Sequence, residues 1–342
     1  MIATPYLLYL GHSNDEIGIK TSRGLAVFRP DICVGEFRHD DCGLTLGLPR
    51  LDFAAARDAG ARTLVLGIAN AGGRLGNDLV EDALAAMEAG LDIASGLHQR
   101  LKDEPRLVAA AARLGRTLHD VRDPRPDIPV GTGRRRAGKR LLTVGTDCSV
   151  GKMYTTLCLA RALQARGVKA DFRATGQTGI LIAGDGVPLD AVVADFISGA
   201  IEQISPDRTD GGWDLIEGQG SLFHPSFAGV STGLLHGAQP DALVLCHDPM
   251  RRTMRGLPHY QPPRLDDCLE ANLRAARLTN PQVRAVGIAL NTSAMDAAQA
   301  TDLCARTADM FGLPCSDPYR MGVDAMVDLL LAMDAPAATE TI

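Results

Sequence analysis

The sequence contains little positive charge and very little lysine. Lys and Arg together number 35 against 41 Asp and Glu, which gives a formal net charge of −6 at pH 7. Nucleic acids and anionic membranes both reward an excess of positive charge, so the composition argues against either as a partner. Only five of the basic residues are lysines. One of them, Lys152, lies in a glycine-containing loop, and in such an arginine-rich chain its position there indicates a specific role.

Metal-binding cysteine pairs and long hydrophobic runs are also absent from the sequence. The eight cysteines form no Cys-x-x-Cys pair and no tight cluster with histidine, so we expect no metal site. No apolar run approaches the length that spans a bilayer, and no basic segment precedes the apolar stretch near the N-terminus. We therefore expect a cytoplasmic protein with reduced thiols and no membrane partner.

A segment rich in Pro, Gly and Arg divides the chain once. It covers residues 125–140 and has no apolar periodicity, which is typical of an interdomain linker. On both sides of it, apolar runs alternate with helix-like patterns, and this alternation predicts parallel sheets covered by helices. We therefore predict an α/β protein with a Rossmann-like domain at 1–124, a P-loop NTPase-like parallel-sheet domain at 141–334 and a flexible tail at 335–342.

Polar residues follow several predicted strands of the second domain. Functional residues of open α/β sheets gather at the carboxyl ends of the strands, so we expect these polar groups to face one crevice. Helices are expected at 154–166 and 190–201, from their apolar spacing. The predicted strands cover residues 141–144, 168–174, 214–216, 242–246 and 286–290.

A phosphate-binding loop is the most specific motif in the chain. It follows the apolar run 141–144 and precedes a helix-like pattern, and in this setting backbone N–H groups and a lysine hold phosphates. The residue after the lysine is normally Ser or Thr, whose hydroxyl holds Mg²⁺. Here that residue is Met153, and Thr155 or Thr156 is the alternative metal ligand one turn further on. The predicted cofactor-binding residues are Gly145, Thr146, Asp147, Cys148, Ser149, Val150, Gly151, Lys152 and Met153.

Part of the second domain resembles a family of ATP-dependent ligases. The pattern Gly-Thr-Asp-x-x-Val-Gly-Lys at 145–152 is similar to the loop of dethiobiotin synthetase and its amidotransferase relatives. The segment Glu217–Gly220 resembles the second acidic motif of that group. The resemblance implies that Asn291 reads an adenine ring, and it breaks at Met153.

A second resemblance covers nearly the whole chain and consists of several blocks in order. The blocks are Asn70–Gly73, Gly96–His98, Gly145–Met153, Gly186–Phe196 and Glu217–Pro225. They are similar to those of a bacterial two-domain family, the D-glutamate N-acetyltransferases of the DgcN type. The resemblance implies acetyl transfer from acetyl-CoA to the amino group of D-glutamate. Phosphate groups of CoA would then occupy the loop, and no hydroxyl for Mg²⁺ would be required after Lys152.

Acetyl transfer to an amine requires a base that removes a proton from the ammonium group. Glu217 is the first candidate, because partial desolvation at a strand end raises the pKa of a carboxylate. A structural or metal-holding role for Glu217, inherited from an ATPase ancestor, remains open, and His224 is the alternative base. Asp195, on the expected helix, is a third candidate that could face the crevice. A covalent acetyl-enzyme on Cys148 is a further alternative, since thiol pKa values fall near helix N-termini.

The carboxylates of an acidic substrate require cationic partners, and arginine is the natural one. The candidates are Arg173, after a predicted strand, and the cluster of Arg251, Arg252 and Arg255 after another, of which Arg252 and Arg255 are the first choices. Asp190 either contacts the substrate or caps the helix expected to begin there. Asp147 is a candidate for recognising the substrate ammonium group.

Two other functions remain open at this point. One is an ATP-dependent ligase of the dethiobiotin synthetase kind that uses Mg-ATP, and the other is a sensor that binds a nucleotide without turnover. Met153 disfavours the ligase, and the polar groups at several strand ends disfavour the sensor. We expect a small-molecule amino-acid substrate, no nucleic acid, and a homo-oligomer on general grounds.

Overall fold

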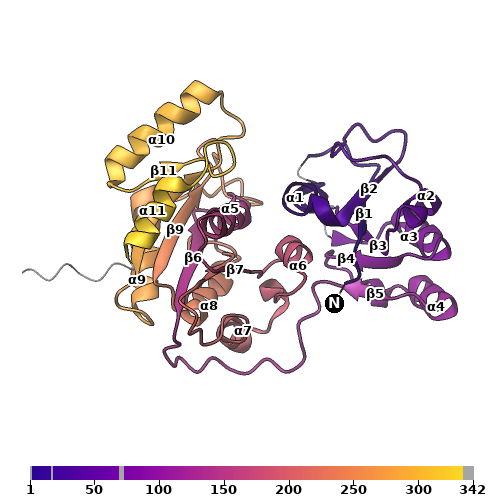
Figure 1. Ribbon diagram of the computed structural model, residues 1–342, viewed down its shortest axis with the longest axis horizontal. Coiled ribbons are helices and arrows are strands. Elements are labelled where there is room, and N and C mark those ends of the chain that lie inside the picture. The colour runs from indigo at the N-terminus through magenta and orange to yellow at the C-terminus, as the bar shows by residue number, and fades with distance from the viewer. Residues whose placement is uncertain (1, 17, 69–72, 334–342) are drawn as a thin grey trace, which may run out of the picture. The chain divides into compact units, whose positions relative to one another are not determined.

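The chain folds into two compact units, which are described separately below (Figure 1). The first unit consists of Met1–Pro124 together with Gly176–Ala191. The second consists of Arg125–Thr175 together with Val192–Ile342. In this computed structural model the residues described are 2–16, 18–68 and 73–333. The tail predicted at 335–342 therefore lies outside the described residues, as does most of the sequence block Asn70–Gly73.

A five-stranded parallel sheet forms the centre of the first unit, in the order β2-β1-β3-β4-β5. Helix α1 covers one face of this sheet, and α2, α3 and α4 cover the other (Figure 1). The strands are β1 (Tyr6–Gly11), β2 (Cys33–Arg38), β3 (Thr63–Leu66), β4 (Asp92–Ser95) and β5 (Leu118–Asp120). The helices are α1 (Lys20–Phe28), η1 (Pro30–Ile32), α2 (Phe53–Asp58), α3 (Asn77–Glu88), η3 (Leu101–Asp103) and α4 (Pro105–Leu114).

Coverage on both faces explains the composition of these strands. Every residue of β1 is buried, and its sequence Tyr-Leu-Leu-Tyr-Leu-Gly is a continuous run rather than an alternating one. Residues that favour helix ends also mark the helix boundaries in the sequence. Helix α4 begins with Pro105, whose missing N–H costs nothing in the first turn, and ends at Gly115 with a φ of 64°.

One segment from the second half of the sequence belongs to the first unit. It contains α6 (Gln177–Ala183) and η4 (Leu189–Ala191), and α6 packs against α1. The hydroxyls of Thr21 and Thr178 lie 2.9 Å apart in this contact. The domain predicted at 141–334 includes residues 176–191, whereas the structure assigns them to the first unit, in which α6 packs against α1 and its apolar side chains Leu181 and Ile182 are buried.

A six-stranded parallel sheet forms the centre of the second unit, in the order β11-β10-β9-β6-β8-β7. The strands are β6 (Lys139–Gly145), β7 (Ala170–Arg173), β8 (Trp213–Ile216), β9 (Ala242–His247), β10 (Arg284–Leu290) and β11 (Cys315–Ser316). The helices are α5 (Lys152–Ala165), η5 (Ala194–Phe196), α7 (Ile197–Ile204), α8 (Ala228–Ala238), α9 (Leu265–Arg277), α10 (Ala297–Phe311) and α11 (Asp324–Ala332).

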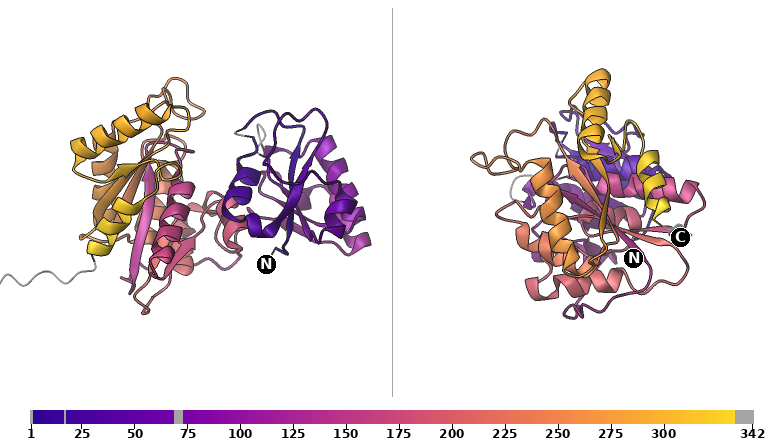
Figure 2. Two further views of the ribbon diagram at one scale, coloured as in Figure 1. Left: turned by 45° about the horizontal axis from the view of Figure 1, so that its top comes forward. Right: turned by 90° about the vertical axis from the view of Figure 1, so that its left-hand side faces the viewer.

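The strand order determines which helices share a face of this sheet. The connection β6–α5–β7 runs toward one edge, whereas β8–α8–β9 and β9–α9–β10 run toward the other. Since crossover connections are right-handed, α8 and α9 lie on the face opposite α5. Contacts agree with this arrangement, because α8 packs against α7 and α9 while α5 packs against α11 (Figures 1 and 2).

Most predicted elements of the second unit are present, but one helix is not. The helix predicted at 154–166 appears as α5, and α5 starts two residues earlier, at Lys152. The helix predicted at 190–201 is wrong, because short turns η4 and η5 precede α7, which starts only at Ile197. The chain passes from the first unit to the second between Ala191 and Val192, so a continuous helix cannot form there.

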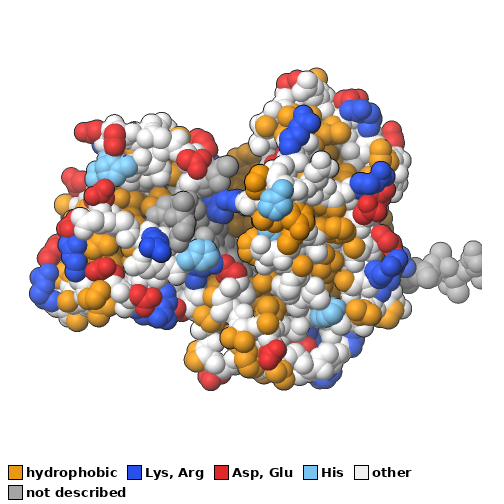
Figure 3. Space-filling model, turned by 180° about the vertical axis from the view of Figure 1, so that it is seen from behind, with side chains coloured by type: hydrophobic (Ala, Val, Ile, Leu, Met, Phe, Trp, Pro, Cys, Tyr) orange, Lys and Arg blue, Asp and Glu red, His pale blue; other side chains and the backbone are white. Residues whose placement is uncertain are grey.

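The surface carries both signs of charge. Acidic and basic side chains alternate with hydrophobic ones on the face shown in Figure 3, and no large area of one sign is seen there. Among the described residues, no helix is long and apolar enough to cross a membrane.

Candidate active site

The phosphate-binding loop connects the central strand β6 to helix α5. Two residues in it have positive φ, Ser149 at 53° and Gly151 at 99°. A β-carbon at Gly145 would lie 2.9 Å from Val150 Cγ2 and 3.2 Å from Lys152 Nζ, so glycine permits this close approach. The backbone N–H groups at the start of α5 form an anion-binding site of the kind found at helix N-termini.

Lys152 lies inside the loop and ties it to the segment after β8. Its ammonium group donates to the carbonyl of Asp147 at 2.7 Å and to the carbonyl of Gly220 at 2.8 Å. The side chain is buried, and burial lowers the pKa of the ammonium group. Both acceptors are carbonyl oxygens rather than carboxylates, so the positive charge of Lys152 has no formal counter-charge in these bonds.

Asp147 holds a second loop, residues 248–255 after β9, against the phosphate-binding loop. Its fully buried carboxylate accepts from Cys148 N at 2.6 Å, from Arg255 N at 2.8 Å and from Arg251 Nη1 at 2.9 Å. Arg251 also donates to the carbonyls of Cys148 and Ser149. The carboxylate is thus committed to internal bonds, which does not favour the predicted role in recognising a substrate ammonium group.

The arginines after β9 differ in their surroundings. Arg251 forms the contacts with the loop described above and lies 3.5 Å from Asp248. Arg255 contacts the Ser149 hydroxyl through its side chain, and Arg252 is exposed. Of the three arginines of this predicted cluster, Arg251 makes the most side-chain bonds to the loop, although Arg252 and Arg255 were the first choices as substrate ligands.

The threonines considered as metal ligands are bonded to the backbone of α5. Thr155 Oγ1 donates to Gly151 O at 3.0 Å, and Thr156 Oγ1 donates to Lys152 O at 2.8 Å. The Thr156 hydroxyl also lies 2.9 Å from that of Thr143 on β6. With a methionine at 153 and these hydroxyls in use, the loop does not fit the donor set that holds Mg²⁺ beside a nucleotide.

Glu217 links the ends of β7 and β8. Its carboxylate accepts from Thr175 N at 3.0 Å, and its carbonyl accepts from the Thr175 hydroxyl at 2.6 Å. The side chain is buried, with 5% exposed. A β-carbon at the neighbouring Gly218 would lie 2.9 Å from Lys152 Cδ, so the backbone next to Glu217 passes close to the lysine of the loop.

His224 is buried beneath the second loop, and both of its ring nitrogens have partners. Nδ1 accepts from Ser226 N at 3.2 Å, so Nε2 carries the proton and donates to Arg255 O at 3.1 Å. Nε2 also lies 4.0 Å from the Asp147 carboxylate. These bonds assign His224 to holding the Arg255 backbone in place.

Cys148 completes a small cluster with Asp147 and His224. Their thiol, carboxylate and imidazole atoms all lie within 4.8 Å of one another, and among the described residues this is the one such group with metal-type ligands. The carboxylate and the imidazole are both fully hydrogen-bonded, however, so a metal would have to displace existing bonds. Burial raises the pKa of the Cys148 thiol, which opposes the reactive thiolate considered above.

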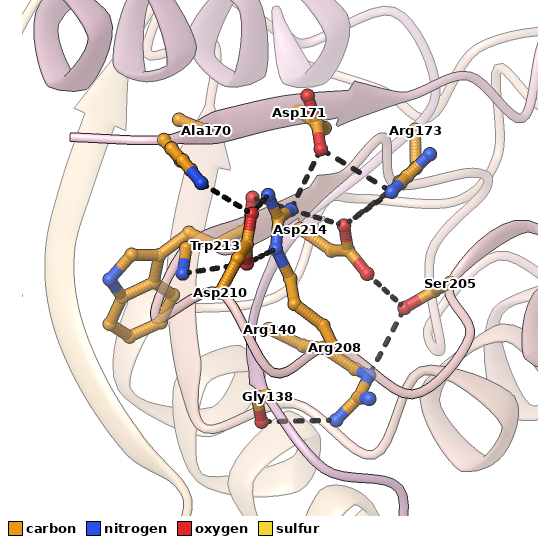
Figure 4. A network of polar contacts seen from close by, with 12 residues as sticks. Gly138, Arg140, Ala170, Asp171, Arg173, Ser205, Arg208, Asp210, Trp213 and Asp214 are labelled. Atoms are coloured by element: carbon orange, nitrogen blue, oxygen red, sulfur yellow. Dashed lines mark hydrogen bonds and ion pairs between the residues drawn. The ribbon is translucent and has the colours of Figure 1, made fainter.

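Arg173 belongs to a buried network below the strand ends (Figure 4). Its guanidinium lies 2.8 Å from Asp214, near the start of β8. Asp214 also bonds Arg208 at 2.9 Å and Ser205 at 2.9 Å, and Ser205 accepts from the buried Arg140. The predicted substrate ligand Arg173 is therefore directed back along the sheet by its partner Asp214.

The two aspartates predicted near 190–195 lie in different units. Asp190 belongs to the first unit, where it forms an ion pair with Arg122 and starts no α-helix. Asp195 belongs to the second unit and is exposed on the turn η5. Neither of them caps a helix.

Asn291 lies against the phosphate-binding loop, as its position after β10 predicts. Its Cβ is 4.0 Å from the place a β-carbon would take at Gly151. Its side-chain carbonyl accepts from Ser293 N at 3.3 Å. Sequence reasoning missed two tyrosines near this point, Tyr154 in the first turn of α5 and Tyr319 after β11. Their rings meet edge to face, and only the rarity of tyrosine in the chain could have drawn attention to them.

Both halves of the chain match profiles of one protein family. Residues 36–124 match a Rossmann-like domain described as DUF1611_N, and residues 129–327 match a P-loop domain described as DUF1611_C. Each is described as a domain of unknown function. The chain belongs to the DUF1611 family. The predicted order of a Rossmann-like domain and a P-loop domain is thereby confirmed.

Several DUF1611 relatives match almost the whole chain. A D-glutamate N-acetyltransferase of Tritonibacter scottomollicae is 51% identical and covers 97% of this chain and 100% of its own. One of a Pseudoalteromonas species is 50% identical, over 95% of this chain and 98% of its own. The crystal structure of a DUF1611 family protein from Anabaena variabilis is 34% identical, with a TM-score of 0.87 over 96% of this chain and 100% of that one. The resemblance to D-glutamate N-acetyltransferases found in the sequence is thereby confirmed.

Proposed function

We propose that this chain is a D-glutamate N-acetyltransferase that takes its acetyl group from acetyl-CoA. The observation that carries the proposal is the match to two relatives of that name, at 51% and 50% identity over nearly the full chain. The phosphate-binding loop supports the choice of donor, because CoA carries phosphates that a helix N-terminus and a lysine can hold.

Lys152 and the backbone N–H groups of the loop are the proposed CoA ligands. The two carbonyls that now accept from Lys152 can be replaced by phosphate oxygens, which are better acceptors because they are charged. No phosphoryl group is transferred, so the loop requires no hydroxyl for Mg²⁺ at Met153. The same donor set does not support the alternative of a ligase that uses Mg-ATP.

The reaction needs a base for the substrate ammonium group. The base takes one proton, and the free amine attacks the thioester carbonyl to form a tetrahedral intermediate. As the C–S bond breaks, the nitrogen loses a second proton, which passes to the departing CoA thiolate, so the products are the amide and the free CoA thiol. Of the three candidates, Glu217 is favoured over His224, whose ring nitrogens hold Arg255 O and Ser226 N, and over Asp195, which is exposed on the turn η5. Since the backbone beside Glu217 passes close to Lys152, this role requires the pantetheine arm of CoA to fold back over the loop.

A Glu217→Gln variant distinguishes a base from a positioning residue. As the base, Glu217 provides the acidic limb of the pH profile of kcat, so the variant loses that limb together with about 100-fold or more in kcat. As a positioning residue, Glu217 instead holds the end of β7 through its bonds with Thr175. The variant then raises KM for acetyl-CoA, and the pH profile of kcat does not change.

The ligands of the substrate carboxylates are also proposals. Arg252 and Arg255 remain the better candidates, because Arg173 is paired with Asp214 and does not face the loop. Asp195 and Asp190 are not supported by any contact that suggests chemistry. A covalent intermediate on Cys148 is disfavoured by the raised pKa of its thiol.

Release of free CoA thiol in the presence of acetyl-CoA and D-glutamate tests the function directly. We expect thiol release that depends on D-glutamate and gives N-acetyl-D-glutamate, and L-glutamate serves as the control for chirality. Absence of thiol release with every amine tested, together with ADP formation from ATP, would show that the ligase reading is correct instead.

A further inference from the structure

A pair of tyrosines lies beside the phosphate-binding loop, the partly buried Tyr154 and the exposed Tyr319, and neither has a role in the mechanism proposed above. Tyr319 follows the edge strand β11 and is 63% exposed, although large aromatic side chains usually bury most of their surface. Its ring centroid lies 6.2 Å from that of Tyr154, with the planes at 79°. The edge of one ring thus supports the other, and a broad face of Tyr319 remains open to solvent.

The position of Tyr319 is fixed by hydrogen bonds between the ends of β10 and β11. The buried carboxylate of Asp317 accepts from Thr292 N at 2.9 Å and from Thr292 Oγ1 at 2.6 Å. Its other oxygen accepts from Tyr319 N at 3.1 Å. Arg320 then closes the group by donating to Thr292 O at 2.7 Å. An exposed ring on such a braced turn is pre-organised, which lowers the entropic cost of binding a ligand.

These contacts also place the tyrosines next to the phosphate cradle. Thr292 follows Asn291, whose Cβ lies against Gly151, the residue before Lys152. Tyr154 is two residues after Lys152 on α5. Phosphate donors, an amide side chain and an aromatic face therefore surround the first turn of a single helix.

The Asn291 amide points to a planar, hydrogen-bonding ligand rather than an aliphatic one. Its carbonyl accepts from Ser293 N, and its NH₂ group has no protein partner among the described residues. An NH₂ donor and an aromatic ring that follow the neighbouring strands β10 and β11 together match a nucleobase, which offers ring nitrogens as acceptors and a π-face for stacking.

We propose that Tyr319, supported by Tyr154, is the stacking surface for the adenine ring of acetyl-CoA, the ring that the sequence resemblance already assigns to Asn291. The assignment rests on the proposed function for the identity of the nucleotide. On this proposal two parts of the second unit bind acetyl-CoA: the phosphate-binding loop holds its phosphates, and the tyrosine pair holds its adenine ring.

The test compares a thioester that carries the nucleotide with one that lacks it. In Tyr319→Ala, KM for acetyl-CoA rises about ten-fold or more, since base stacking on an aromatic ring is of that size. KM for acetyl-pantetheine does not change, because that donor has no base. Tyr319→Phe keeps the ring and restores KM for acetyl-CoA. Met310→Ala, which removes another side chain exposed on this unit, is the matched control and leaves both values unchanged.

Equal effects on both donors, or no effect on acetyl-CoA, would overturn the proposal. Direct binding of adenosine 3′,5′-bisphosphate, followed by calorimetry, separates it from the proposed reaction. In one outcome the protein does not acetylate D-glutamate, but it binds this nucleotide and Tyr319→Ala weakens the binding. That outcome supports the adenine site and contradicts the proposed acetyltransferase function. In the other outcome the reaction occurs but Tyr319→Ala binds the nucleotide normally. That outcome contradicts the adenine site and leaves the acetyltransferase function supported.

Discussion

At the carboxyl end of the C-terminal sheet, a backbone loop is surrounded by Lys152 and Arg251, whereas the carboxyl end of the N-terminal sheet carries imidazoles and carboxylates. There His12 follows β1 and His39 follows β2, and their rings stack with centroids 3.9 Å apart. His39 Nε2 lies 2.8 Å from the carboxylate of Asp82, which also accepts from the Tyr9 hydroxyl at 2.6 Å.

Two parallel sheets of similar topology thus present different chemistry at the same structural position. The C-terminal sheet directs N–H groups and cations to one point, which suits a bound anion. The N-terminal sheet pairs each of these imidazoles with a carboxylate, His12 with Asp41 and His39 with Asp82. Strand-end residues, and not the sheet, therefore decide what each unit can bind, and the variants below separate the two regions.

The largest effect is expected from Gly218→Ala in the C-terminal unit. A β-carbon there would lie 1.8 Å from the carbonyl oxygen of Thr143 and 2.9 Å from Lys152 Cδ, so backbone must move. We expect a loss of about 3 kcal/mol or more in the free energy of unfolding, with loss of acetyl-CoA binding. Urea denaturation and calorimetry measure the two effects.

Gly229→Ala is the matched control for this substitution. No atom lies within 4 Å of the added carbon, and Gly229 is inside helix α8, so alanine should be neutral or slightly stabilising. If Gly218→Ala were as stable as Gly229→Ala and bound acetyl-CoA normally, the close approach of β6 and the Glu217 segment would not be needed to form the loop.

The next largest effect is expected from Asp147→Ala. It removes a fully buried carboxylate and leaves Arg251 Nη1 and two backbone N–H groups without their acceptor. Breaking a buried ion pair by removing one partner costs about 3 kcal/mol. We also expect weaker acetyl-CoA binding, because the second loop loses its attachment. Thermal unfolding with and without acetyl-CoA measures both, and an unchanged Tm would contradict the role assigned to Asp147.

The contacts of Asp147 show which parts of the site could be predicted from the sequence and which could not. The loop itself was predicted, because its glycines, its lysine and the flanking strand and helix are contiguous in the chain. The bond between Asp147 and Arg251 joins residues 104 positions apart, and no local pattern encodes it. For the same reason the bonds that occupy His224 were not foreseen.

Residues 176–191 show in the same way that the sequence does not reveal contacts between distant segments. Their apolar pattern predicted secondary structure within the second domain, but it contained no information on which core would bury it. Helix α6 packs against α1, at a sequence distance of more than one hundred residues. Tyr319 was missed because exposure of a side chain depends on the packing of the whole unit.

An intermediate effect, confined to stability, is expected from Asp82→Ala in the N-terminal unit. The substitution leaves the buried Tyr9 hydroxyl without its acceptor, and a buried unsatisfied donor costs about 1–3 kcal/mol. Burial, and then the hydrogen bond to Asp82, raise the pKa of Tyr9, so this hydroxyl keeps its proton. Urea denaturation should show the loss, whereas the affinity for adenosine 3′,5′-bisphosphate should not change. A weaker affinity would mean that the two regions do not act independently.

The smallest effect is expected from Asp41→Asn at the same N-terminal sheet. Asp41 is exposed and lies 2.7 Å from His12 Nδ1, and this hydrogen bond holds its pKa below the ordinary value of 3.8. A depressed folded-state pKa stabilises the protein above the unfolded pKa, and that contribution disappears as pH falls through the folded value. Solvent screening keeps the contribution of an exposed pair small, so Tm at pH 7 should be the same within error. The wild type should lose slightly more Tm than the variant between pH 5 and pH 3, and the reverse order would assign the stabilising charge to another group.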